Sequence, residues 1–225
     1  MKSIKFLSLA AMLMIFVSCS NDDDNSPPAD ELTISLGITG YKASFYQSGE
    51  SGEVMVTSTI GDPTVDIAEG TDSSITYNAV TNRVEWTQLL PIGDNVVTIV
   101  ATVDGTEATT DITIENEFEG TFSGGNNNDP LDTDNVDNSL VSVVFSSDNT
   151  LALTDDSGND ATGTWSLDGN TITLIITYDD VDYYTYQGDI VYNGAEAYVD
   201  GMWYNGQEAE VGMEQGYFRI DFLEI

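Results

Sequence analysis

WSLDGNTITLIITYDD, residues 165–180, contains two strand-like runs on either side of a short polar turn. The dipeptide Asp168-Gly169 is suited to the positive φ angles of a type I′ turn, so the stretch predicts a β-hairpin. FSSDNTLALT, residues 145–154, predicts another hairpin across a polar turn. Consecutive hairpins form an up-and-down meander, which can close on itself at about eight strands. We therefore predict a β-barrel in the second half of the chain.

A short pattern recurs in this half as Gly120-Thr121-Phe122-Ser123, Gly163-Thr164-Trp165-Ser166 and, more loosely, Gly201-Met202-Trp203-Tyr204. GTWSLDGNTITLI, residues 163–175, and the preceding VVFSSDNTLALT resemble the lipocalin-like domains of secreted Bacteroidota proteins, in which a Gly-Thr-Trp start and a Gly-Asn-Thr hairpin recur. The resemblance covers most of residues 117–225 and implies an up-and-down barrel with Trp165 closing one end. It identifies no ligand, because such barrels host many.

The first half of the mature chain has the same strand periodicity. Leu32, Ile34, Leu36 and Ile38 alternate with polar residues or glycine, which is typical of a strand with one buried face. No later stretch keeps helical spacing, so we predict an all-β protein. The segment IENEFEG, residues 114–120, offers a boundary between two domains.

Short strands between turns at 49–52, 61–63 and 94–95 indicate a β-sandwich over residues 31–115. LPIGDNVVTIVATVDGTEATTDITIEN, residues 90–116, resembles the last hairpin of the immunoglobulin-like modules of secreted bacterial proteins. The resemblance implies an immunoglobulin-like β-sandwich that acts as a spacer or support for the barrel.

The N-terminal residues have the layout of a secretory signal. Lys2 and Lys5 precede the apolar run 6–17, which is too short to span a bilayer as a helix. Phe16-Val17-Ser18-Cys19 resembles the lipobox of bacterial lipoproteins. This resemblance implies a signal peptide at 1–18, cleavage after Ser18, and acylation of Cys19 with chains such as palmitate, and several chains anchor a protein stably. The alternative is a plain signal peptide with an incidental cysteine.

Ser20-Asn21-Asp22-Asp23-Asp24 follows the cysteine and resembles the acidic export tag of surface-displayed Bacteroidota lipoproteins. It implies a lipid-anchored protein exposed on the outer membrane. The alternative is a solvated linker, and in either case residues 19–30 have the composition of a flexible acidic tether.

The charge balance excludes one class of partner. Beyond residue 18 the chain carries 39 acidic residues and three basic ones, Lys42, Arg83 and Arg219, which gives a net charge of −36. Such a field repels phosphate backbones, so we expect no nucleic-acid partner, and we expect the membrane contact to be the lipid. The single cysteine forms no internal disulfide, so each domain depends on its core.

The chain has no histidine and no cysteine after Cys19, which removes Ser-His-Asp and Cys-His machinery and histidine-bearing zinc sites. We therefore expect a non-enzymatic protein with no catalytic residues. A pair of carboxylates acting as a glycoside hydrolase is the remaining enzymatic alternative.

NNNDPLDTDNVDN, residues 126–138, is the candidate metal site. Asp129, Asp132, Asp134 and Asp137 offer oxygen ligands at spacings that a loop can fold around calcium. The segment lacks the glycine and the terminal glutamate of an EF-hand, and it equally has the composition of a solvated surface loop. We therefore expect no cofactor, with calcium bound at this segment as the alternative.

Aromatic residues are concentrated between 178 and 204. By strand alternation Tyr184, Tyr186 and Tyr192 share one face. Together with Trp203 and Tyr204 they are the candidate ligand-binding residues, which could stack on sugars or enclose an apolar ligand. The alternative is that tyrosine is favoured in strands and fills the core.

Three functions follow, in order of preference. The first is a surface lipoprotein whose barrel binds a small apolar molecule or a glycan. The second is a structural or adhesive surface protein that depends on calcium and its acidic face. The third is a carboxylate hydrolase.

Overall fold

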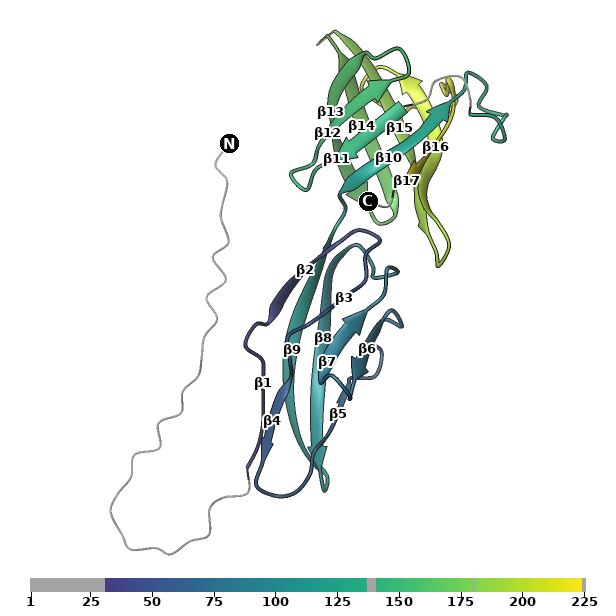
Figure 1. The fold of residues 1–225 in the computed structure, drawn as a ribbon. Helices are drawn as coiled ribbons and strands as arrows, with labels where there is room; N and C mark the ends of the chain where they lie inside the picture. The colour runs from purple at the N-terminus through teal and green to yellow at the C-terminus, as the bar shows by residue number, and fades with distance from the viewer. Residues whose placement is uncertain (1–30, 137–140, 180, 224–225) are drawn as a thin grey trace, which may run out of the picture. The chain divides into compact units, whose positions relative to one another are not determined.

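The computed structural model describes residues 31–136, 141–179 and 181–223, which form strands, turns and loops (Figure 1). The predicted all-β class is confirmed. The described residues contain no helix that is long and apolar enough to cross a membrane. Residues 1–30, with Cys19 and the acidic tag, and Asp137 lie outside the described ranges, so the predictions for them stay predictions.

Between Glu31 and Glu117, nine strands form three sheets, with orders β2-β9-β8-β5, β3-β7-β6 and β1-β4. All pairs are antiparallel except β2 with β9. The strands are β1 (Leu32–Ser35), β2 (Gly40–Ser44), β3 (Gly49–Glu50), β4 (Met55–Ser58), β5 (Thr64–Ile67), β6 (Ile75–Asn78), β7 (Arg83–Trp86), β8 (Gly93–Val103) and β9 (Thr106–Glu117).

Buried and partly exposed residues alternate along the β8–β9 hairpin. Val97, Ile99 and Ala101 are fully buried, and the residues between them are partly exposed. The core that they share with the other strands includes Val84, Leu90, Ile112 and Ile114. The turn of this hairpin is centred on Asp104 and Gly105, which both have positive φ as a type I′ turn requires.

The second half is a closed barrel of eight strands in sequential order, each antiparallel to the next, with β17 returning to β10 (Figure 1). The predicted up-and-down barrel is therefore confirmed. Its strands are β10 (Gly120–Asn126), β11 (Val141–Phe145), β12 (Thr150–Asp155), β13 (Asp160–Asp168), β14 (Thr171–Tyr178), β15 (Asp182–Tyr192), β16 (Ala197–Asn205) and β17 (Gly216–Phe222).

The β13–β14 hairpin forms as predicted, but its turn differs in register and type. Asp168 pairs with Thr171, so the turn is centred on Gly169 and Asn170, one residue later than predicted. Gly169 has a φ of 62°, whereas Asn170 is not among the residues with positive φ. Glycine at the first central position with positive φ there alone is the pattern of a type II′ turn, so the type I′ prediction is wrong here.

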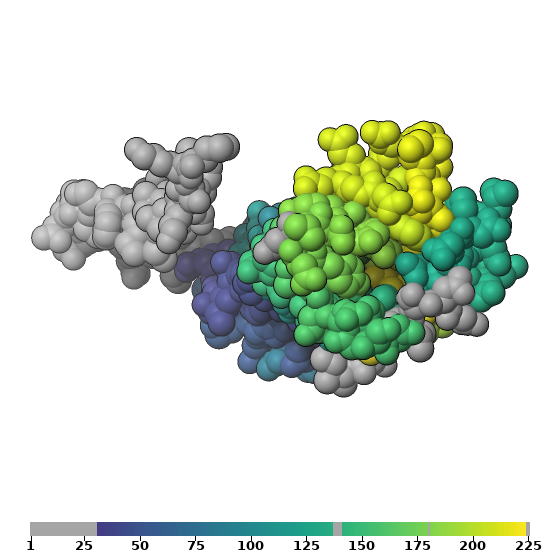
Figure 2. All heavy atoms as spheres, turned by 90° about the horizontal axis from the view of Figure 1, so that it is seen from above, coloured from purple at the N-terminus to yellow at the C-terminus, as the bar shows by residue number. Residues whose placement is uncertain are grey.

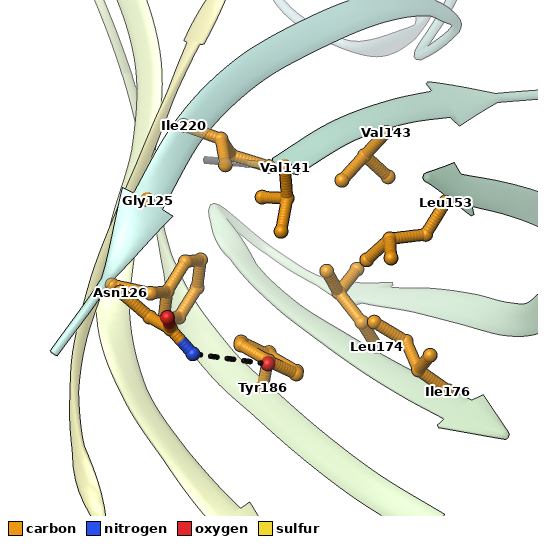
Figure 3. A pocket seen from close by; sticks show the side chains of 10 residues that line it. Gly125, Asn126, Val141, Val143, Leu153, Leu174, Ile176, Tyr186 and Ile220 are labelled. Atoms are coloured by element: carbon orange, nitrogen blue, oxygen red, sulfur yellow. Dashed lines mark hydrogen bonds between the residues drawn. The ribbon is translucent and has the colours of Figure 1, made fainter. Parts of the chain in front are cut away.

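The axis of the barrel is filled with apolar side chains. Phe122, Ile172, Leu174, Ile176, Val199, Phe218 and Ile220 are at most 2% exposed. The cavity that remains among such residues has a volume of about 10 Å³ (Figure 3). That is room for about one water molecule. The described residues of the interior therefore leave no room for a ligand at this cavity.

One end of the barrel is closed by packed aromatic rings, and we call it the base. Phe118, Phe145 and Trp165 contact one another with ring centroids 5.1 to 6.2 Å apart. The Trp165 indole also donates hydrogen bonds to the carbonyls of Ser146 and Thr150, each at 3.1 Å. Trp165 thus lies at one end of the barrel, as predicted.

Phe45, in the segment after β2, belongs to the core of the barrel. It is 1% exposed, and its ring centroid lies 4.9 Å from that of Phe118 and 5.5 Å from that of Phe222. Next to it, Tyr46 donates a hydrogen bond of 2.8 Å to the carbonyl of Asn193 in the β15–β16 turn. The first half of the chain therefore supplies two side chains to the base, which the sequence did not predict.

Candidate functional site

The end of the barrel opposite the base carries the β10–β11, β12–β13, β14–β15 and β16–β17 connections, and we call it the mouth. A groove of about 400 Å³ lies there. Figure 2 views the molecule from this side, where a recess opens between the green, yellow and teal segments. The groove is about forty times larger than the space inside the barrel, since the latter holds only about 10 Å³.

The groove forms where the inward-facing side chains of a strand change from apolar to polar or aromatic. Along β12, Leu151 and Leu153 face the core and the next inward position is Asp155. Along β14, the corresponding row ends in Tyr178. Because side chains alternate along a strand, each row continues in the same direction as it leaves the core. The result is a polar and aromatic rim on an apolar barrel, with Asn126, Asn128, Asn159 and Asp182 completing it.

Four rings from three strands line the groove: Tyr178, Tyr184, Tyr186 and Trp203. Tyr178 meets Tyr184 edge to face at a centroid distance of 5.9 Å, and Tyr184 meets Trp203 at 6.2 Å and 58°. Tyr186 stacks with Trp203 at 6.4 Å and 26°. Tyr178, Tyr184 and Trp203 remain partly exposed, so part of each ring is accessible to a ligand.

Tyr186 separates the groove from the small interior cavity, because it lines both. Its ring packs edge to face on Phe218 at 5.2 Å. Its hydroxyl accepts a hydrogen bond of 3.4 Å from the Asn126 amide, which is the dashed line in Figure 3. Burial raises the pKa of the Tyr186 hydroxyl well above its ordinary value, so it stays protonated.

Asn127 fixes one wall of the groove. Its side chain is buried, and its side-chain oxygen accepts a hydrogen bond of 3.0 Å from the Tyr217 amide. Its side-chain amide donates to the carbonyls of Asp132 and Asn135 in the β10–β11 connection. Its own carbonyl accepts a hydrogen bond of 2.7 Å from the Trp203 indole. One asparagine therefore holds both the acidic connection and a groove ring.

Of the described residues that line the groove, Asp155 and Asp182 carry carboxylates. Asp155 accepts hydrogen bonds of 2.8 to 2.9 Å from the amides of Ser157 and Asn159 and from the Asn159 side chain. These bonds, chiefly those from Asn159, lower the pKa of Asp155. Asp182 stands opposite Tyr178 in the β14–β15 ladder, and opposite residues project to the same side. Both carboxylates are at least partly exposed.

The five predicted ligand-binding residues are distributed over three places. Tyr184, Tyr186 and Trp203 line the groove, since β15 and β16 pair with Tyr186 opposite Trp203. Tyr192 lies at the base, where its ring contacts Phe45 at 5.6 Å. Tyr204 is 7% exposed and borders a separate hollow of about 440 Å³ beside the β16–β17 connection. The structure therefore brings three of the five together.

The predicted calcium ligands are only partly described. Asp129 and Asp132 each accept a hydrogen bond from a backbone amide two residues later, those of Leu131 and Asp134. Among the described residues no group of three or more acidic side chains is arranged to hold a metal ion. Because Asp137 is outside the described residues, the calcium hypothesis stays a prediction.

The groove also contains residues that were not predicted to bind a ligand: Tyr178, Asn126, Asp155, Asn159 and Asp182. The signal was present in the alternation, because each continues the inward row of its strand to the mouth. Recognising it requires knowing which end of each strand points away from the base. No protein-family model matches the chain, and no curated protein sequence matches it.

Proposed function

We propose that this protein is a non-enzymatic binding lipoprotein exposed on the outer membrane and anchored by acyl chains on Cys19. In this proposal residues 31–115 form an immunoglobulin-like spacer and residues 117–225 a lipocalin-like barrel. The ligand, a small molecule or a glycan, binds in the groove at the mouth of the barrel and not along its axis.

One observation carries the proposal: four aromatic rings converge with amide and carboxylate groups on one groove, while the interior is packed. Flat rings with polar neighbours are suited to stacking on sugar rings or on other flat, partly apolar molecules. A groove of about 400 Å³ falls within the usual range for small-molecule sites, which is roughly 300–1,000 Å³.

Replacing a groove ring tests the binding function. Tyr184→Ala removes a partly exposed ring that contacts both Tyr178 and Trp203. Tyr183→Ala is the matched control, because its side chain points to the opposite face of β15. Full-length protein is screened on an array of neutral oligosaccharides and small aromatic glycosides, and the affinity of each hit is measured by calorimetry.

We expect Tyr184→Ala to weaken binding of a hit about tenfold, which corresponds to ~1.4 kcal/mol. Tyr183→Ala is expected to bind like the unaltered protein. Equal affinity of all three proteins would show that the ligand binds elsewhere and would refute the proposed binding site in the groove.

The anchor is tested separately by cell fractionation. Cys19→Ala removes the acylated sulfur, so the protein is expected to leave the membrane fraction, whereas Ser20→Ala is expected to stay. Retention of the Cys19→Ala protein in the membrane would contradict the anchoring proposal.

A further inference from the structure

The charged side chains that line the groove narrow the class of ligand that it can bind. Of its polar side chains, Asp155 and Asp182 are anionic, and Asn126, Asn128 and Asn159 are neutral. Among the described residues that line it there is no lysine or arginine. A ligand with a carboxylate, sulfate or phosphate would find no cationic partner in this groove.

The three basic residues of the described chain are all engaged elsewhere. Lys42 pairs with Glu115 and Glu117, and Arg83 pairs with Glu50. Arg219 pairs with Glu196 at 3.0 Å and with Asp221 at 2.8 Å, and its guanidinium lies 3.7 Å from the centroid of the Tyr198 ring. Moving any of them to an anionic ligand would break an existing ion pair.

The two carboxylates flank one ring. Asp182 is directly opposite Tyr178 in the β14–β15 ladder. Asp155 is close enough to Tyr178 for its charge to add to the effect of burial in raising the pKa of that phenol. Asp155 is held by its three hydrogen bonds, so it keeps its position and its charge before a ligand arrives.

We propose that the groove binds ligands that carry a protonated amine or another organic cation, with the cation over the rings of Tyr178 and Tyr184 and between Asp155 and Asp182. A ring face attracts a cation through its quadrupole, and the two carboxylates add direct charge attraction. This inference rests on the proposed binding function of the groove and makes Asp155 and Asp182 its specificity-determining residues.

Three tetrasaccharides that differ in charge test it: fully deacetylated chitotetraose, which is cationic at about pH 5.5, neutral tetra-N-acetylchitotetraose, and anionic tetragalacturonate. Binding to the full-length protein is measured by calorimetry at about 0.01 M and 0.15 M salt. We expect the cationic sugar to bind at least about tenfold more tightly than the neutral one at low salt, with the advantage falling at high salt. The anionic sugar is expected not to bind.

The whole protein is anionic, so attraction of the cationic sugar to its net charge must be distinguished from binding in the groove. Asp155→Asn/Asp182→Asn removes both groove charges and is expected to reduce the advantage of the cationic sugar to less than about threefold. The matched control, Asp62→Asn/Glu107→Gln, removes the same charge from exposed positions in the first half. It is expected to keep the full advantage. Thermal midpoints close to that of the unaltered protein show that the variants are folded.

Equal binding of the cationic and neutral sugars would overturn the inference, as would a cationic preference that survives in the groove variant. Either result leaves the proposed function standing if the neutral sugar still depends on Tyr184. Absence of binding by all three sugars overturns the inference, and the array screen with Tyr184→Ala then decides the proposed function independently.

Discussion

The two ends of the barrel use aromatic residues in opposite ways. At the base, Phe45, Phe118, Phe122, Phe145 and Trp165 are at most 8% exposed, and their rings pack on one another. At the mouth, Tyr178, Tyr184 and Trp203 contact one another but stay partly exposed. Phenylalanine has no polar atom and is stable in a dry core, whereas tyrosine and tryptophan carry a polar group suited to a wet boundary.

The barrel thus buries its aromatic rings at the base and leaves ring surface accessible at the mouth. Ring contacts at the base bury apolar area and stabilise the fold. Ring contacts at the mouth leave area available for a ligand. Variants at the base should therefore change the free energy of unfolding, and variants at the mouth should change binding more than stability.

The largest effect is expected from Phe45→Ala. The substitution empties a site in the barrel base that is filled from the first half of the chain, so the free energy of unfolding should fall by about 3 to 5 kcal/mol. The measurement is denaturant unfolding followed by tryptophan fluorescence. Tyr178→Ala at the mouth is the comparison and should cost less than about 1.5 kcal/mol, since that ring is partly exposed. A smaller loss for Phe45→Ala than for Tyr178→Ala would break the contrast between the two ends.

A smaller loss of stability is expected for a substitution between the two ends of the barrel, where β15 and β16 approach closely. A Cβ atom on Gly188 would lie 2.2 Å from the backbone oxygen of Asp200, which side-chain rotation cannot relieve. Gly188→Ala should therefore lower the free energy of unfolding by about 1 to 3 kcal/mol. Gly194, in the β15–β16 turn, has no atom within 4 Å of that position. Gly194→Ala is the matched control and should change stability by less than about 0.5 kcal/mol in the same denaturant titration. Equal stability of the two variants would show that the strands can separate without cost.

Much of the fold could be predicted from local pattern, because strand alternation and turn chemistry act over a few residues. Ile172, Leu174 and Ile176 alternate and are buried, and the dipeptide Asp104-Gly105 forms the turn that its composition favours. The turn after β13 was misplaced because Asp168, Gly169 and Asn170 are all turn residues. Cross-strand pairing then selects the register, which local composition cannot do.

The candidate site was less predictable, because it is assembled from strands far apart in sequence. Tyr186 and Trp203 meet because they are opposite each other in the β15–β16 ladder. Tyr192 shares a face with Tyr186 but lies six residues along the strand, about 20 Å, which carries it to the base. Tyr204 follows Trp203 directly, so it points to the outer face. Phe45 could not be assigned to the barrel from its local sequence, because its partners begin more than seventy residues later.

The smallest expected effect concerns carboxylates in exposed turns, where the two ends should behave alike. Hydrogen bonds lower the pKa of Asp155 at the mouth, chiefly through Asn159, and that of Asp148 in the β11–β12 turn at the base, chiefly through Thr150. A carboxyl group whose pKa is lower in the folded state stabilises that state fully above its unfolded pKa of about 3.9, and this stabilisation is lost as the pH falls through the folded-state pKa.

The thermal midpoint of the unaltered protein minus that of Asp155→Asn should therefore be constant above about pH 5 and shrink towards pH 2. Asp148→Asn should give a curve of the same form. Taking differences removes the general effect of protonating the other acidic residues, which changes all three proteins alike. If the midpoint difference for Asp155→Asn shrank at low pH and that for Asp148→Asn stayed constant, the two ends would differ in the electrostatics of their turns as well as in the burial of their rings.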